Sequence, residues 1–197
     1  MEYIDFLELL QVCDMAEDEP LDSEHPTAAV AVVWAREPEE SVLLIRRAVN
    51  ESDPWSGHWS FPGGRTAPVD SDLLDTALRE LREECRIELA RAALIRELPH
   101  SWAGRRVGRF VKVAPFVLGV ERQLEATPDE SEASECVWIP LRTFTDRTLH
   151  QWGPAPGVPP ERHFPAIGLK GTPLWGFTYK VLCDWTGTEP PPEPSRR

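Results

Sequence analysis

The chain has 197 residues, of which 41% are hydrophobic and 27% are charged, so it can bury the core of one domain and lacks the composition of a disordered chain. Its 21 basic and 33 acidic residues give a net charge of −12, which argues against nucleic-acid or anionic-membrane partners, because these need a basic surface. The absence of a membrane-length apolar stretch, the lack of a signal-peptide pattern at the start and four scattered cysteines lead us to expect a cytoplasmic protein.

Apolar periodicity and turn residues predict the secondary structure in chain order. We expect a helix at 3–12, strands at 28–34 and 41–45 joined as a hairpin, a loop at 50–70, a helix at 71–88, strand-like runs at 107–120 and 136–139, a proline-rich loop at 153–165 and a helix at 174–185. Strands on both sides of a central helix predict an α/β fold with helices packed on a mixed sheet. One domain is expected at 1–187, followed by a disordered Pro- and Glu-rich tail at 188–197.

The helix expected at residues 71–88 carries the candidate chemistry. At about 100° per residue, Glu80, Glu83 and Glu84 lie close together beside its apolar face. Each like-charged pair costs an isolated helix about 0.2–0.5 kcal/mol. Two arrangements relieve this repulsion: surface ion pairs with arginines of the same helix, or a divalent cation such as Mg²⁺ or Mn²⁺, which binds carboxylate oxygens.

A glycine-rich turn lies immediately upstream of this helix. The sequence Phe61-Pro62-Gly63-Gly64 contains two glycines, which allow the backbone to approach a ligand closely. No Gly-Lys-[Ser/Thr] follows, so the turn is not a Walker A loop. Together, the turn and the acidic helix favour a metal site over isolated surface acids.

Residues 63–87 resemble the Nudix box, Gly-x5-Glu-x7-Arg-Glu-U-x-Glu-Glu-x-Gly-U, where U is aliphatic. Residues 79–84, Arg-Glu-Leu-Arg-Glu-Glu, match its core without a gap. Arg86 stands where the pattern has its second Gly, and Ser71 stands where it has the upstream Glu, with an aspartate on each side as a substitute. The segment is also one residue longer than the pattern.

Other motifs resemble the coenzyme A pyrophosphatase branch of the Nudix family. Residues 43–48, Leu-Leu-Ile-Arg-Arg-Ala, match its Leu-Leu-Thr-x-Arg-[Ser/Ala] signature except at Ile45, and Ser52 stands about where an Arg is expected. Residues 175–178, Trp-Gly-Phe-Thr, resemble a C-terminal Trp-Gly-x-Thr stretch of that branch. The likeness spans about residues 28–185 and is strong at the box but partial in the branch signature.

The resemblance implies a Nudix-type α/β/α sandwich with a central mixed β-sheet and a site for Mg²⁺ or Mn²⁺. Glu80, Glu83 and Glu84 would hold the ion, aided by a backbone carbonyl near Gly63. Arg79 would orient these carboxylates.

The general base has two candidates. We assign it to Glu83, and the other candidate is Glu132 in the run Pro128–Glu135, for which a merely hydrated acidic loop is the alternative. An acidic chain that binds phosphates also needs local positive charge, and arginine suits bidentate phosphate contacts. The candidate substrate-binding arginines, for each of which a surface ion pair is the alternative, are Arg46, Arg47, Arg65, Arg106 and Arg109.

The resemblance predicts metal-dependent hydrolysis of a phosphoanhydride, with coenzyme A or an acyl-CoA cleaved to 3′,5′-ADP and 4′-phosphopantetheine. Two alternatives stay open. The incomplete branch signature allows a broader nucleotide or nucleotide-sugar pyrophosphohydrolase, and the departures from the box would suit a non-catalytic Nudix-like binding module. The expected partner is a nucleotide-type small molecule, with neither nucleic acid nor membrane, and a homodimer is left open.

Overall fold

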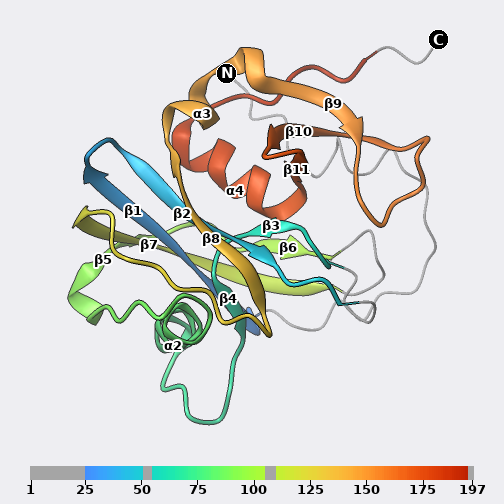
Figure 1. The fold of residues 1–197 in the computed structure, drawn as a ribbon. Helices are drawn as coiled ribbons and strands as arrows, with labels where there is room; N and C mark the ends of the chain where they lie inside the picture. Colours follow the sequence, from blue (N-terminus) through green and yellow to red (C-terminus); the bar gives the residue numbers. More distant parts are fainter. Residues whose placement is uncertain (1–24, 51–54, 105–109, 195–197) are drawn as a thin grey trace.

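The structure, a computed structural model, describes residues 25–50, 55–104 and 110–194. The helix expected at 3–12 lies outside these residues. Helices cover both faces of a central sheet (Figure 1). The elements are β1 (Ala28–Glu37), β2 (Ser41–Arg47), β3 (Trp59–Ser60), β4 (Gly63–Arg65), α2 (Leu73–Cys85), a 3-10 turn (Arg91–Ala93), β5 (Leu94–Glu97), β6 (Ser101–Ala103), β7 (Val111–Arg122), β8 (Ala133–Pro140), α3 (Arg142–Thr145), a second 3-10 turn (Arg147–Leu149), β9 (His150–Pro154), β10 (His163–Leu169), β11 (Thr172–Trp175) and α4 (Gly176–Thr186).

The central sheet is mixed, as expected. Among the described residues its eight strands follow the order β3-β2-β1-β7-β5, with β4 paired to β1, β6 to β7 and β8 to β2. β1 and β2 form the expected antiparallel hairpin, with Trp34 opposite Val42. β1 and β7 are parallel along their length, and Val30 lies opposite Pro115. The described part of the strand-like run expected at 107–120 is therefore a single long strand that begins at Val111.

Alternate residues of β1 face opposite sides of this sheet and enter two separate cores. Val32 packs in the core that α4 covers, whereas Ala31 and Val33 pack in the core that α2 covers. The helix α2 buries Leu74, Ala77, Leu81 and Cys85, which are the apolar positions of its amphipathic pattern. The α/β/α arrangement of layers is confirmed, and it places α2 beside β4 (Figure 1), with Gly64 of β4 against Glu80 of the helix.

The proline-rich segment at 153–165 is where the predicted elements differ most from the structure. Instead of a loop throughout, it contains the end of β9 and the start of β10, which pair with each other in a three-stranded sheet whose third strand, β11, pairs with β10. The last helix begins at Gly176, two residues later than expected, because β11 occupies Thr172–Trp175. In the described part of the tail, the Pro191 carbonyl accepts a hydrogen bond from Trp152 Nε1 at 3.0 Å. Over the described residues, every helix is too short or too polar to cross a bilayer.

The two ends of α2 are capped in different ways. Asp72 is the N-cap, and its carboxylate accepts a hydrogen bond from the Asp75 amide at 2.9 Å. Arg86 is the C-cap and adopts the left-handed conformation, with φ of 57°, while its amide donates to the Arg82 carbonyl. Arginine therefore takes the conformation that glycine favours at this position, so the helix still ends directly after Cys85.

We expect Arg86→Gly to raise the free energy of unfolding by about 0.5–1 kcal/mol. The left-handed conformation costs a non-glycine residue about 1–2 kcal/mol, whereas the ion pair of Arg86 with Asp129 is partly exposed and is worth about 0–1 kcal/mol. Arg86→Ala loses the same ion pair but keeps the strained backbone, so it is the matched control. Urea denaturation of both variants tests this, and a glycine variant no more stable than the alanine variant would contradict it.

Candidate metal centre

The glycine turn brings β4 against both β1 and α2. A Cβ atom on Gly63 would lie 2.4 Å from the carbonyl oxygen of Ala29 in the adjoining strand. A Cβ atom on Gly64 would lie 2.5 Å from Oε1 of Glu80. A side chain at Gly63 would collide with backbone, whereas one at Gly64 would displace the end of the Glu80 side chain. The two glycines therefore let β4 lie directly against β1 and against Glu80 of α2.

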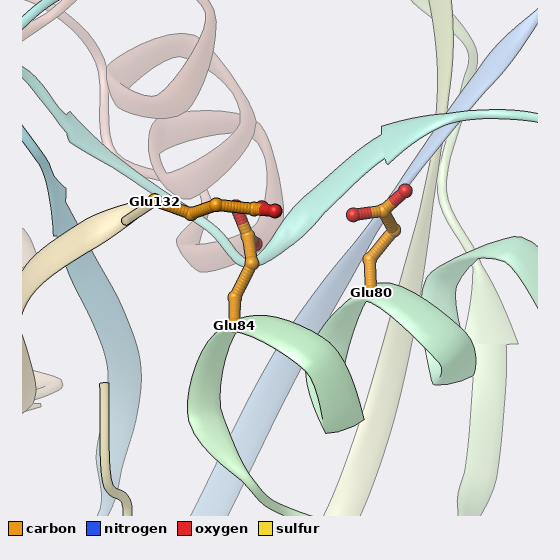
Figure 2. A group of neighbouring side chains, drawn as sticks. All are labelled: Glu80, Glu84 and Glu132. Carbon is orange, nitrogen blue, oxygen red and sulfur yellow. The ribbon is translucent and has the colours of Figure 1, made fainter. Parts of the chain in front are cut away.

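Three glutamates converge at this place (Figure 2). One carboxylate oxygen from each of Glu80, Glu84 and Glu132 can be chosen so that the three atoms lie within 4.8 Å of one another. Glu80 and Glu84 project from neighbouring turns of α2, and Glu132 reaches over from the chain just before β8. Glu84 is buried, Glu80 is half-buried and Glu132 is exposed, so the cluster is open to solvent on one side.

Burial raises the pKa of Glu84 to about 8. The Gly63 amide donates a hydrogen bond to Glu84 Oε2 at 2.8 Å and opposes this rise, as does the charge of Arg47, whereas the charges of Glu80 and Glu132 add to it. Burial also raises the pKa of Glu80. Closely spaced carboxylates with raised pKa values favour a bound cation, and oxygen ligands suit Mg²⁺ or Mn²⁺. The residues present therefore fit the metal that the resemblance implies.

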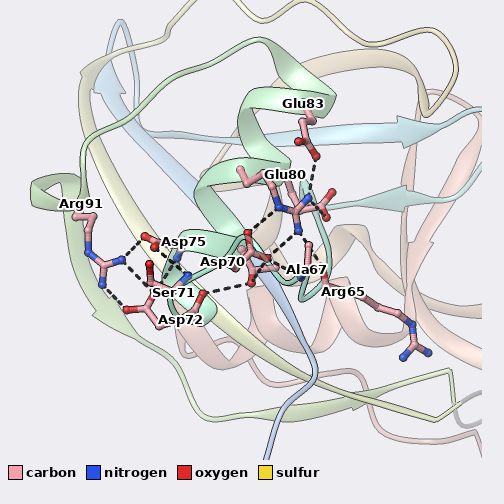
Figure 3. Close-up of polar contacts among 11 residues, drawn as sticks. Arg65, Ala67, Asp70, Ser71, Asp72, Asp75, Glu80, Glu83 and Arg91 are labelled. Carbon is pink, nitrogen blue, oxygen red and sulfur yellow. Dashed lines mark hydrogen bonds and ion pairs between the residues drawn. The ribbon is translucent and has the colours of Figure 1, made fainter.

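Arg79 links Glu80 of the cluster and the neighbouring Glu83 to the turn before the helix; its partners Asp70, Glu80 and Glu83 are labelled in Figure 3. Its Nε and Nη2 atoms donate to the two oxygens of Asp70 at 2.8 and 3.0 Å. Its Nη1 atom donates to Glu80 at 2.7 Å and to Glu83 at 2.8 Å. Nη2 also donates to the Arg65 carbonyl at 3.0 Å. Arg79 is thus placed to fix the orientation of Glu80.

Asp70 anchors this arrangement. Besides binding Arg79, it accepts hydrogen bonds from the Ala67 amide at 2.8 Å and from Thr76 Oγ1 at 2.9 Å. The Arg79 guanidinium holds the pKa of Asp70 far below its usual range. Of the two aspartates beside Ser71, it is Asp70 that binds Arg79, whereas the other caps the helix. Sequence spacing alone left this choice open.

The group that the structure brings together differs from the expected set. The carboxylate of Glu83 is half-exposed and pairs with Arg79, and it lies outside the cluster of three. Glu132, considered only as a candidate base, takes the third place. The Gly63 amide donates to Glu84, and the backbone carbonyl ligand expected near Gly63 stays a prediction.

The candidate substrate-binding arginines have different surroundings. Arg46 donates to Thr172 Oγ1 at 2.8 Å and to the Gly57 carbonyl at 3.3 Å, which joins β2 to the second sheet. The positive charge of Arg47 acts on Glu84. The side chain of Arg65 is exposed and points away from the Arg79 network in Figure 3. The remaining two, Arg106 and Arg109, lie outside the described residues.

We expect the affinity of the protein for Mn²⁺ to rise with pH up to about 8. In the metal-free state Glu84 has a pKa of about 8, and a carboxylate must lose its proton before it binds a metal. Below that pH each binding event releases a proton, so the apparent affinity should rise about tenfold per pH unit and then level off. Calorimetric titration from pH 6 to 8.5 in two buffers measures both affinity and proton release. An affinity that is constant across this range would contradict the prediction.

Comparison with known proteins places this geometry in a family context. The family profile described as NUDIX domain matches residues 25–159. The chain is 36% identical over 125 residues to an uncharacterized Nudix hydrolase, NudL, of Yersinia enterocolitica, a match that covers 64% of this chain and 62% of the relative. Among the first curated relatives, the matched region covers from 32% to 62% of the relative's length.

Solved structures show the same fold. A MutT/nudix family protein from Enterococcus faecalis superposes with a TM-score of 0.58 at 17% identity, covering 92% of this chain and 67% of that one. The NUDIX domain of Shewanella oneidensis NrtR, crystallised with ADP ribose, superposes with a TM-score of 0.50 at 22% identity, covering 69% of this chain and 83% of that one. At these identities the likeness concerns the fold alone.

Proposed function

Because the chain belongs to the NUDIX domain family, we propose that it is a metal-dependent hydrolase of a phosphoanhydride bond in a nucleoside diphosphate derivative. The observation that carries this proposal is the cluster of Glu80, Glu84 and Glu132, with ligand oxygens within 4.8 Å of one another. A binding module would have no need of three converging carboxylates, two of them with raised pKa values.

The side chains have separate tasks in this reaction. Glu80, Glu84 and Glu132 would hold Mg²⁺ or Mn²⁺, and Arg79 keeps Glu80 in place from the other side. The ion, when bound, would neutralise phosphate charge and lower the pKa of a water molecule. The general base is assigned to Glu83, which is half-exposed beside the cluster and can reach solvent; Glu132 remains the alternative.

The finer proposal is that the substrate is coenzyme A or an acyl-CoA. The first of the two segments that resemble the coenzyme A branch contacts the strand that leads into the second, because Arg46 of β2 donates to Thr172 of β11 at 2.8 Å. Trp59 Nε1 also donates to the Leu169 carbonyl at 3.2 Å. These contacts hold the second sheet and the Trp175–Thr178 stretch beside the strand that leads into the glycine turn.

ADP-ribose is the second candidate substrate. It is the ligand named for the Shewanella oneidensis NUDIX domain, and like coenzyme A it contains a phosphoanhydride linked to adenosine. The choice between the two depends on the group beyond the diphosphate.

Product analysis tests the proposal. The protein is incubated with Mg²⁺ or Mn²⁺ and, separately, coenzyme A, NADH, ADP-ribose and deoxynucleoside triphosphates. We expect 3′,5′-ADP and 4′-phosphopantetheine from coenzyme A. A preference for ADP-ribose would replace the substrate but keep the reaction class, and no metal-dependent turnover of any compound would favour the binding module. Glu83→Gln and Glu132→Gln distinguish the two candidate bases, because only loss of the true base removes the acidic limb of the pH–rate profile, where protonation of that base lowers the rate.

A further inference from the structure

The loop between β7 and β8 (residues 123–132, called here the β7–β8 loop) closes the C-terminal end of α2. The last carbonyls of a helix lack partners within the helix itself. In this protein the Thr127 amide donates to the Cys85 carbonyl at 2.9 Å, and the Asp129 amide donates to the Glu84 carbonyl at 3.0 Å. The loop is therefore bound directly to the helix turn that carries Glu84.

The side chain of Asp129 makes a second connection between the end of α2 and the β7–β8 loop. Its Oδ2 atom accepts from Arg86 Nη2 at 2.6 Å, at the C-cap of α2. Its Oδ1 atom accepts from the amide of Ser131 at 3.0 Å and from the hydroxyl of Ser131 at 2.5 Å. One carboxylate thus connects the end of the helix with the residue directly before Glu132.

The backbone of Asp129 continues this connection into Glu132 itself. The Asp129 carbonyl accepts from the amides of Glu132 at 2.9 Å and Ala133 at 2.8 Å, which folds the loop into one turn. The Glu132 carbonyl in turn accepts from the Ala48 amide at 2.9 Å. Glu132 is the member of the cluster that is exposed and comes from outside α2, so its position relative to Glu84 depends on this turn.

We propose that Asp129 is a positioning residue that places the Glu132 carboxylate over Glu80 and Glu84, with Arg86 as its link to the helix. This inference rests on the proposed function only in taking the cluster as the metal site. Arg86 stands where the family pattern has glycine, and its guanidinium supplies a contact to Asp129 that glycine could not make. The coupling of helix end to loop is therefore a property of this chain's own residues.

A double-mutant cycle on the full chain tests the proposal. The Mn²⁺ dissociation constant, kcat and KM are measured for the wild type, Asp129→Ala, Glu132→Gln and the double variant. Loss of a group that orients a metal ligand commonly costs about 10–100-fold in affinity or activity. We expect Asp129→Ala to weaken Mn²⁺ binding or lower kcat about tenfold with an unchanged KM. In the Glu132→Gln background it should have no further effect, because Asp129 acts through Glu132.

Two further variants keep the test independent of folding. Asp129→Asn keeps an acceptor for Ser131 and should restore most of the Mn²⁺ affinity lost in the alanine variant. Asp146→Ala is the matched control, since Asp146 Oδ1 accepts from the amide and hydroxyl of Thr148 at 3.0 and 2.6 Å in the same local pattern, at the 3-10 turn after α3. Asp146→Ala should leave Mn²⁺ affinity and kcat unchanged.

Three results would bear against the positioning role of Asp129 or the proposed function. An Asp129→Ala variant that binds Mn²⁺ and turns over as the wild type does, or whose effect adds in full to that of Glu132→Gln, would overturn the positioning role. If the wild type binds Mn²⁺ but hydrolyses nothing, the proposed function fails while the Mn²⁺ cycle still decides the role of Asp129. If neither Glu132→Gln nor Asp129→Ala changes Mn²⁺ binding or kcat, the role is refuted.

Discussion

Glu84→Gln is expected to lower kcat about a thousandfold while leaving the fold intact. The substitution removes a charged ligand from the cluster but keeps an oxygen that can accept the hydrogen bond from the Gly63 amide. A metal ion at a developing phosphate charge contributes several kcal/mol, and each 1.4 kcal/mol corresponds to about a factor of ten in rate. Steady-state kinetics with saturating Mn²⁺ measure this effect. An active Glu84→Gln variant would contradict the assignment.

Although Glu84→Gln should lower kcat, it should make the metal-free protein more stable at high pH. The pKa of Glu84 lies near 8 in the folded, metal-free protein and at its ordinary value of 4.5 when the chain is unfolded. The folded state therefore binds an extra proton between these values, so this carboxyl's contribution to stability is present below pH 4.5 and is lost as the pH rises through 8. We expect metal-free Glu84→Gln to match the wild type at pH 5 and to melt at a higher temperature at pH 9.

Glu83→Gln is the control for metal binding. Glu83 lies one position away on the same helix but pairs with Arg79 outside the cluster. Mn²⁺ should raise the melting temperature of the wild type and of Glu83→Gln, because a ligand that binds only the folded state stabilises it. Mn²⁺ should raise the melting temperature of Glu84→Gln only slightly. A loss of the Mn²⁺ shift in Glu83→Gln would instead place Glu83 among the ligands.

Asp70→Ala is expected to reduce the free energy of unfolding by about 3–5 kcal/mol. Asp70 and Arg79 form a two-point ion pair with side chains only 4% and 14% exposed. Removing the acid leaves the guanidinium without its main partner and also deprives the Ala67 amide and the Thr76 hydroxyl of their acceptor. Chemical denaturation measures the loss, and a change below about 1 kcal/mol would contradict this account.

Asp72→Ala is the matched comparison. Asp72 caps the same helix from an exposed position, so its loss should lower the free energy of unfolding by about 1 kcal/mol.

The stability that Asp70 contributes should also depend on pH. Because Arg79 depresses the pKa of Asp70, the stability that Asp70 contributes is present above its unfolded pKa of about 3.9 and is lost as the pH falls through the lower folded value. The difference in free energy of unfolding between the wild type and Asp70→Ala should therefore become smaller in strong acid.

Elements with a strong local pattern could be predicted from the sequence. The runs 28–34 and 41–45 are apolar and bounded by turn residues, and the helix at 71–88 has a continuous apolar face; each corresponds to an observed element within a few residues. The parallel pairing of β1 with β7 could not be read from these patterns, because it joins residues that are 85 positions apart, such as Ala28 and Val113.

The second sheet escaped prediction because its residues have turn-forming composition. Pro154 and Pro165 both lie in strands of this sheet, and proline is ordinarily evidence against a strand within a sheet. The pairing of Pro165 with Trp152 is a tertiary contact, and such contacts override local preference.

The sequence predicts the part of the candidate site that lies within one helix, but not the part that tertiary contacts bring to it. Glu80, Glu84 and Arg79 lie within one helix, so their proximity follows from helical spacing. Glu132 joins them only through the antiparallel pairing of β8 with β2 and the turn at Asp129. An acidic run in a loop gives no sign of which of its acids will reach the cluster.

The most direct measurement is a crystal structure with Mn²⁺, with the ion located by its anomalous signal. We expect one strong peak among Glu80, Glu84 and Glu132, at coordination distance from Glu84, with Arg79 still bound to Asp70. A site that stays without Mn²⁺ at millimolar concentration, or an ion held by Glu83 with Glu132 turned away into solvent, would contradict it.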